Sequence, residues 1–100
     1  MSYSFRAPMR RSTGEAAWYF ITLPFDVADD IAERSGESRR GFGSVRVSVT
    51  VGATTWATSV FPSNEAESYV LPVKKAVRTT EGLEDGEPVS VVLELVDPAG

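Results

Sequence analysis

Three basic residues on one side of a predicted helix are the strongest candidates for chemistry in this sequence. Lys74, Lys75 and Arg78 fall on one face of a helix expected over residues 72–81. The residues before the lysines offer no side-chain N-cap, and the helix dipole disfavours two cations in the first turn. Backbone N–H groups and ammonium groups would converge there, which predicts an anion-binding site. The alternative is a solvated basic face. The opposite side of the helix is expected to pack on the core through Val73, Ala76, Val77 and Thr80.

A basic loop and the strand after it add further candidate cations. Arg39 and Arg40 precede a Gly-Phe-Gly sequence centred on Phe42, a combination that RNA- and phosphate-binding loops use. The glycines lead into a strand and not into a helix, so a dinucleotide-binding fingerprint is excluded. Arg46 lies in that strand, on the face opposite to its valines. The alternative is a surface loop whose aromatic ring folds back onto the body of the protein.

The composition excludes several classes of site. The 100 residues include no cysteine and no histidine, which removes disulfides, thiolate chemistry, the commonest general base and the favoured zinc ligand. The net charge of −4 argues against strong nonspecific binding to nucleic acid. Acidic residues crowd the turn over residues 81–87, but they lack the ligand spacing of a calcium loop. We therefore predict no catalytic residues, no metal and no cofactor, in a protein that is not an enzyme.

The N-terminal third predicts two strands and a helix. Alternation over residues 2–11 is typical of a half-buried strand, and Pro8 favours a place at a sheet edge or bulge. A strand over residues 16–23 would carry apolar residues on both of its faces, which predicts a central strand covered on both faces. We accordingly expect the large aromatic residues in the core: Trp18, Tyr19, Phe20 and Trp56. A helix follows with Asp26 as its N-cap and, as its apolar stripe, Val27, Ala28 and Ile31.

The middle of the chain predicts a β-hairpin whose register can be worked out. Valines alternate with polar residues over 45–51, and the Gly-Ala dipeptide at 52–53 fits a two-residue turn with glycine first. Such a turn fixes which residues of the two strands face each other. Two pairs follow from it: Val49 with Trp56 on the core side, and Arg46 with Ser59 on the outer side.

The remaining segments complete a small barrel. Residues 68–71 and 89–96 are predicted strands, and the helix over 72–81 lies between them in the sequence. About six short strands cannot bury their faces as a flat sheet. We therefore predict a mostly β, single domain over residues 1–100, folded as a small closed or nearly closed β-barrel with two short helices.

Three parts of the sequence resemble the bacterial and archaeal family called domain of unknown function 1905. The resemblance covers about residues 3–96 in the family's order and rests on these segments: 17–24, 41–47 with the turn and tryptophan at 52 and 56, and 69–78 with 82–83 and 85–89. It implies a closed β-barrel of Greek-key type with short helices. It implies no activity and no catalytic residues, because the family is named for lacking a known function. The family's Leu-Pro-x-Lys-Lys segment matches residues 71–75, which makes the two lysines worth testing.

These observations predict a non-catalytic binding or interaction module for an anionic group on a small molecule or a protein. Its candidate contact residues are Lys74, Lys75, Arg78, Arg39, Arg40 and Arg46. The alternative is a nucleic-acid-binding regulator or an antitoxin-like protein, because swapped-hairpin transcription factors and antitoxins share a Pro-led basic helix ahead of a similar turn. No stretch approaches the ~18–20 apolar residues of a membrane span, and the N-terminus lacks the apolar core of a signal peptide. We expect a soluble cytoplasmic protein that is a monomer or weak dimer.

Overall fold

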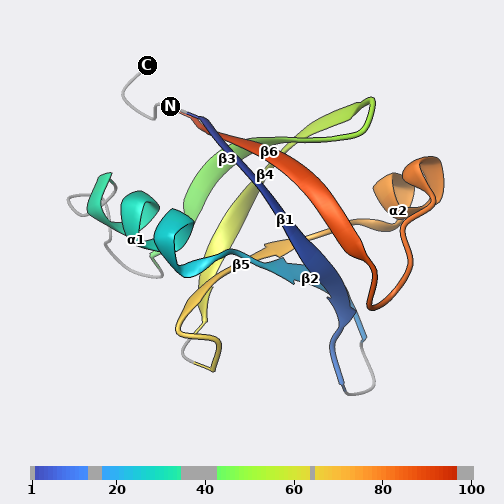
Figure 1. Ribbon diagram of the computed structural model, residues 1–100, viewed down its shortest axis with the longest axis horizontal. Coiled ribbons are helices and arrows are strands. Elements are labelled where there is room, and N and C mark those ends of the chain that lie inside the picture. Colours follow the sequence, from blue (N-terminus) through green and yellow to red (C-terminus); the bar gives the residue numbers. More distant parts are fainter. Residues whose placement is uncertain (1, 14–16, 35–42, 64, 97–100) are drawn as a thin grey trace.

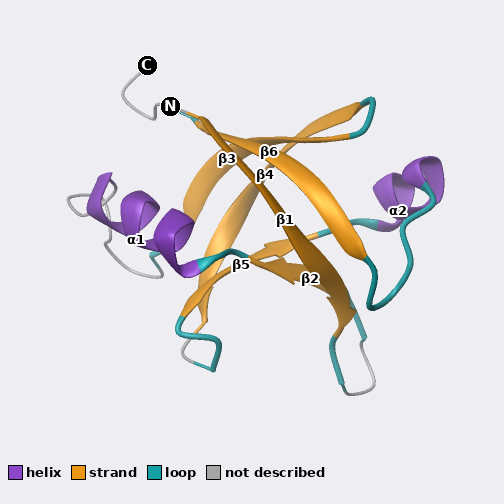
Figure 2. Ribbon diagram, in the orientation of Figure 1, coloured by secondary structure: helices purple, strands orange, loops and turns teal. Residues whose placement is uncertain are grey.

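Alternating apolar residues close the chain into a barrel. The computed structural model describes residues 2–13, 17–34, 43–63 and 65–96, and in these ranges six antiparallel strands and two helices are found (Figure 1, Figure 2). The strands are β1 (Ser2–Arg11), β2 (Tyr19–Thr22), β3 (Val45–Val51), β4 (Thr54–Ser63), β5 (Ser68–Pro72) and β6 (Pro88–Leu95). The helices are α1 (Phe25–Arg34) and α2 (Lys75–Glu81). Around the barrel the strands follow the order β1, β2, β5, β4, β3, β6 and back to β1, which confirms the predicted closed barrel.

The barrel contains a Greek key. Strands β3, β4 and β5 are consecutive neighbours, and the chain then passes through α2 before β6 returns to pair with β3. The spatial order β6, β3, β4, β5 is the arrangement that defines a Greek key. Closure gives each of the six described strands two neighbouring strands, each paired over part of its length.

Pro8 was expected at a sheet edge or bulge, and it has a strand partner from β6 while the pairing of β1 with β2 begins one residue later. Pro8 lies opposite Pro88, at the end of the pairing between β1 and β6. The next residue, Met9, is already paired with Ile21 of β2. Proline cannot donate a ladder hydrogen bond, so it is tolerated where β1 exchanges one partner strand for the other.

The β3–β4 hairpin has the predicted register. Val49 pairs with Trp56 and Arg46 pairs with Ser59, around a two-residue turn at Gly52. The turn requires glycine because φ at Gly52 is 60°, in the left-handed region. Trp56 is 9% exposed and belongs to the core, as predicted.

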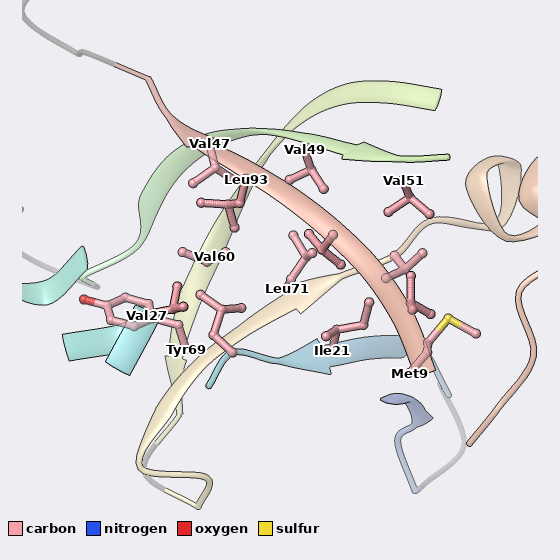
Figure 3. Packing of buried hydrophobic residues seen from close by; sticks show 14 of the residues in the cluster. Met9, Ile21, Val27, Val47, Val49, Val51, Val60, Tyr69, Leu71 and Leu93 are labelled. Carbon is pink, nitrogen blue, oxygen red and sulfur yellow. The ribbon is translucent and has the colours of Figure 1, made fainter. Parts of the chain in front are cut away.

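The core fills the barrel interior with aliphatic side chains from all six described strands (Figure 3). Several are fully buried, including Met9, Ile21, Val47, Val49, Val60, Leu71 and Leu93. Each such side chain contributes about 1.5–3 kcal/mol by leaving water. The interior is therefore packed mainly with apolar side chains; Ser68 is a buried polar residue among those described, and its hydroxyl donates to the Leu23 carbonyl at 2.8 Å.

The helix α1 begins one residue before the predicted cap. The Ala28 N–H donates to the Pro24 carbonyl at 2.9 Å, so Asp26 already lies inside the first turn. Its carboxylate instead accepts a hydrogen bond from the adjacent Val27 N–H at 2.9 Å. The N-cap assignment of Asp26 is therefore wrong, although its charge remains at the favourable end of the helix dipole. The predicted apolar stripe is confirmed, since its residues are all buried: Val27, Ala28 and Ile31.

The helix α2 begins at Lys75, three residues after the predicted start. Pro72 stays in β5 opposite Phe20, and the Val73 N–H continues the strand pairing by donating to the Tyr19 carbonyl at 2.9 Å. Strand pairing therefore competes successfully with the helix for these residues. The predicted end is correct, because Gly82 caps the helix with φ 64°.

The prediction that the strand around Tyr19 is covered on both faces is wrong. Ile21 points into the core, but Phe20 is only half-buried on the outer face and Trp18 is 44% exposed. Of the four aromatic residues expected in the core, Trp56 and the buried part of Tyr19 meet that expectation. The outer face of the barrel at β2 therefore presents aromatic rings to solvent.

Candidate functional site

The helix α2 places its basic residues in two different environments. Lys74 is the N-cap residue, in an extended conformation, and not a first-turn residue as predicted, whereas the predicted lack of a side-chain cap is confirmed. Lys74 and Lys75 are exposed, whereas Arg78 is half-buried. The helix is thus rotated from the predicted orientation, with Val77 and Arg78 towards the barrel. The predicted packing of Ala76 and Thr80 on the core is wrong, because both are exposed.

Arg78 is held against an aromatic ring and not against a carboxylate. Its Cζ atom lies 4.0 Å from the centre of the Tyr19 ring, a cation–π geometry. Its Nε atom is buried and has no hydrogen-bond partner among the described residues. In the part of the chain that the structure describes, the ion pair found is Arg34–Asp30, so Arg78 is not paired with an acid. The guanidinium charge is therefore fixed in position but not neutralised.

A hollow of about 470 Å³ adjoins this guanidinium, and we call it the Arg78 hollow. Its described lining consists of Tyr19, Lys75, Arg78, Thr79, Gly82, Leu83, Glu84 and Asp85. The cations come from α2 and the two acids come from the turn that follows it. Asp85 is already engaged, because its carboxylate accepts a hydrogen bond from the Arg11 N–H at 3.0 Å. The hollow can therefore supply a guanidinium, an ammonium and a hydroxyl group to an anionic ligand.

The other candidate cations do not join this hollow. Arg46 lies on the outer face near the start of β3, whereas α2 contacts the turn at the other end of that strand through Glu81. The strand between Arg46 and Gly52 spans about 20 Å. Arg39 and Arg40 lie outside the described residues. A single patch that combines Arg46 with the α2 cations is therefore not formed.

A second hollow, which sequence reasoning missed, lies on the outer face of the barrel. It has a volume of about 610 Å³. Its lining includes Phe20 from β2, Trp18 immediately before β2, Val70 from β5, and the charged residues Arg11 and Glu65. We call it the Trp18 hollow. The sequence contains a signal for it, since residues 16–23 are apolar on both faces, but that pattern equally fits a buried strand.

One further polar cluster ties β1 to α1. The Tyr3 hydroxyl donates to Oδ2 of Asp30 at 2.5 Å, and Nε of Arg34 donates to the same oxygen at 2.8 Å. These hydrogen bonds, that from Tyr3 first, lower the pKa of Asp30. Burial and the bond to Asp30 raise the pKa of Tyr3. The side chains of Tyr3 and Arg34 thus meet at one oxygen of Asp30, which links β1 to α1.

Neither a metal site nor a membrane-spanning helix is found within the described ranges. There, no three acidic, histidine or cysteine side chains are grouped closely enough to hold a metal ion. None of the described helices has the length and apolarity to cross a membrane. The cytoplasmic location stays a prediction of the sequence.

A protein-family model covers most of the chain. Residues 5–93 match the model of the family described as domain of unknown function (DUF1905). The chain belongs to this family. The match begins within β1, ends within β6 and includes Tyr19, Lys75 and Arg78 of this DUF1905 chain. No curated protein matches the chain.

Proposed function

We propose that this DUF1905 chain is a non-catalytic binding module that takes an anionic group of a small molecule or protein partner in the Arg78 hollow. The observation that carries the proposal is the guanidinium of Arg78, stacked 4.0 Å over Tyr19 without a carboxylate partner among the described residues. A charged group that is held in place before binding loses little conformational entropy when its ligand arrives. Lys75, from the preceding turn of α2, adds a second positive charge.

The two acids on the rim set the selectivity of the hollow. Glu84 and Asp85, from the turn after α2, also line the hollow and would repel an anion that lies close to them. Asp85 is partly compensated by the Arg11 N–H, whereas Glu84 is exposed. A compact anion that stays near α2 is therefore favoured over an extended polyanion. This preference supports a small anionic group over the nucleic-acid alternative at this hollow.

The test is an NMR titration of the amide spectrum with inorganic pyrophosphate. We expect shifts at Lys75, Arg78 and Thr79, and loss of these shifts in Arg78→Met. Arg46→Gln removes the same charge from a distant outer position and is the matched control, which should bind as the wild type does. Glu84→Gln should strengthen binding severalfold, because it removes a like charge from the rim. Equal losses in Arg78→Met and Arg46→Gln would show that only net charge matters, and would overturn the proposal.

A further inference from the structure

The Trp18 hollow has an aromatic wall that is exposed but fixed in position. The Ser12 N–H donates to the Trp18 carbonyl at 2.8 Å, and the Trp18 N–H donates back to Oγ of Ser12 at 2.9 Å. These two bonds extend the pairing of β1 with β2 by one step beyond Arg11 and Tyr19. The Trp18 backbone is therefore anchored, although the indole is 44% exposed.

A neighbouring ring supports the indole from one side. The ring centres of Trp18 and Phe20 lie 5.1 Å apart with an angle of 41° between their planes. At this separation the two rings contact each other and leave no space for a third ring between them. A flat ligand can instead stack on the open side of Trp18. Val70, which is 9% exposed, provides an apolar floor between the strands.

The rim carries one cation and one carboxylate that can interact with a ligand. Arg11 and Glu65 both line the hollow and are exposed. Neither takes part in the ion pair found among the described residues, that of Arg34 with Asp30. The rim near Glu65 is ordered by Ser63, whose hydroxyl accepts a hydrogen bond from the Ala66 N–H at 3.2 Å. The hollow thus combines a stacking surface, an apolar floor, a positive charge and a negative charge.

We propose that the Trp18 hollow binds a nucleotide unit, which is a flat heteroaromatic base carrying a phosphate. The base stacks on Trp18, the phosphate pairs with Arg11, and the Glu65 carboxylate accepts hydrogen bonds from amino or ring N–H groups of the base. Stacking of a base on an aromatic side chain is insensitive to sequence and is the usual mode of single-strand recognition. A volume of about 610 Å³ lies in the range of small-ligand pockets. The unit can come from a free mononucleotide or from an unpaired base of a single strand.

The chain supplies its own control for the measurement. It has two tryptophans, of which Trp18 is 44% exposed and Trp56 is 9% exposed in the core. In a titration with guanosine monophosphate, the indole N–H signal of Trp18 should shift and that of Trp56 should stay in place. Guanosine, which lacks the phosphate, should bind about tenfold more weakly, and ribose 5-phosphate, which lacks the base, should not move the Trp18 signal.

Three variants test the assigned roles, with binding followed by amide shifts at Phe20 and Ser63. Trp18→Leu keeps an apolar side chain but removes the ring, and should weaken binding about tenfold or more. Arg11→Gln should weaken nucleotide binding and leave guanosine binding unchanged. Arg6→Gln removes an equal charge from the outer face of the same strand, outside the hollow, and should have no effect. Arg78→Met should also leave nucleotide binding unchanged. The absence of nucleotide binding at the Trp18 hollow and the absence of pyrophosphate binding at the Arg78 hollow can therefore be distinguished.

A single-stranded hexanucleotide distinguishes the two sources. Tighter binding of the hexanucleotide than of the mononucleotide, with an affinity that falls as salt rises, identifies a single strand as the source. If the hexanucleotide binds, per nucleotide, as tightly as the mononucleotide does, the free mononucleotide is identified as the source of the unit. No shift of the Trp18 signal at millimolar nucleotide, or a full response in Trp18→Leu, overturns the proposal.

Discussion

The hydroxyl of Thr54 donates to the Glu81 carboxylate at 2.6 Å and so joins the β3–β4 turn to the last residue of α2. The same carboxylate lies where a Cβ atom on Gly52 would be placed. The turn therefore needs glycine for its left-handed backbone, and a side chain there would also displace the Glu81 carboxylate from Thr54. This contact holds α2, and with it Arg78, against the barrel.

Gly52→Ala should lower the free energy of unfolding by about 2 kcal/mol, because it adds backbone strain of about 1–2 kcal/mol and displaces the Glu81 carboxylate from its hydrogen bond with Thr54. Gly82→Ala is the matched control, since Gly82 has nearly the same φ, 64°, but no described residue other than its chain neighbours lies within 4 Å of where its Cβ would be. Urea denaturation of both variants measures the difference. A loss in Gly52→Ala that is no larger than in Gly82→Ala would contradict the proposed contact.

Lys74→Ser should raise the free energy of unfolding by about 1 kcal/mol, because serine supplies the side-chain cap that α2 lacks and removes a cation from the positive end of the helix. Thermal or urea unfolding checks this. Lys75→Ser, one residue inside the helix, cannot cap it and should give no such gain. If Lys74→Ser binds pyrophosphate as the wild type does, Lys74 is a surface residue and the Arg78 hollow depends on Lys75 and Arg78.

The Asp30 cluster predicts a specific dependence of stability on pH. The pKa of Asp30 is lowered in the folded protein, first by the Tyr3 hydroxyl and then by Arg34, from an ordinary value of 3.8. The contribution of Asp30 to the stability of the fold is therefore complete above pH 3.8, and it is lost as the pH falls through the lower pKa that Asp30 has in the folded protein. The melting temperature of Asp30→Asn should lie below that of the wild type at neutral pH, and the gap should close in acid. Asp29→Asn removes the same charge from an exposed neighbouring position and should show no closing gap. A gap that stays constant down to about pH 2 would contradict the prediction.

The register of the β3–β4 hairpin was predicted correctly from residues that are close together in the sequence. The pairing of Val49 with Trp56 follows from alternation and a two-residue turn, both of which are local. The start of α2 could not be predicted in this way, because Pro72 is kept in β5 by Phe20, which lies far earlier in the chain. The exposure of Trp18 was missed for a related reason. Alternation shows that a strand has two apolar faces, but only the closed barrel determines which face remains in contact with water.

Arg78→Met provides the sharpest separation of binding from folding. The cation–π contact with Tyr19 contributes about 0.5–2 kcal/mol, whereas the buried Nε without a partner costs about 1–3 kcal/mol. Methionine keeps the apolar part of the side chain and removes both effects, so the free energy of unfolding should stay equal or rise by about 1 kcal/mol. Pyrophosphate binding should nevertheless be lost. An arginine that adds nothing to stability but is required for binding has the profile of a functional residue. A loss of more than about 2 kcal/mol in urea denaturation would instead make Arg78 a residue that the fold itself requires.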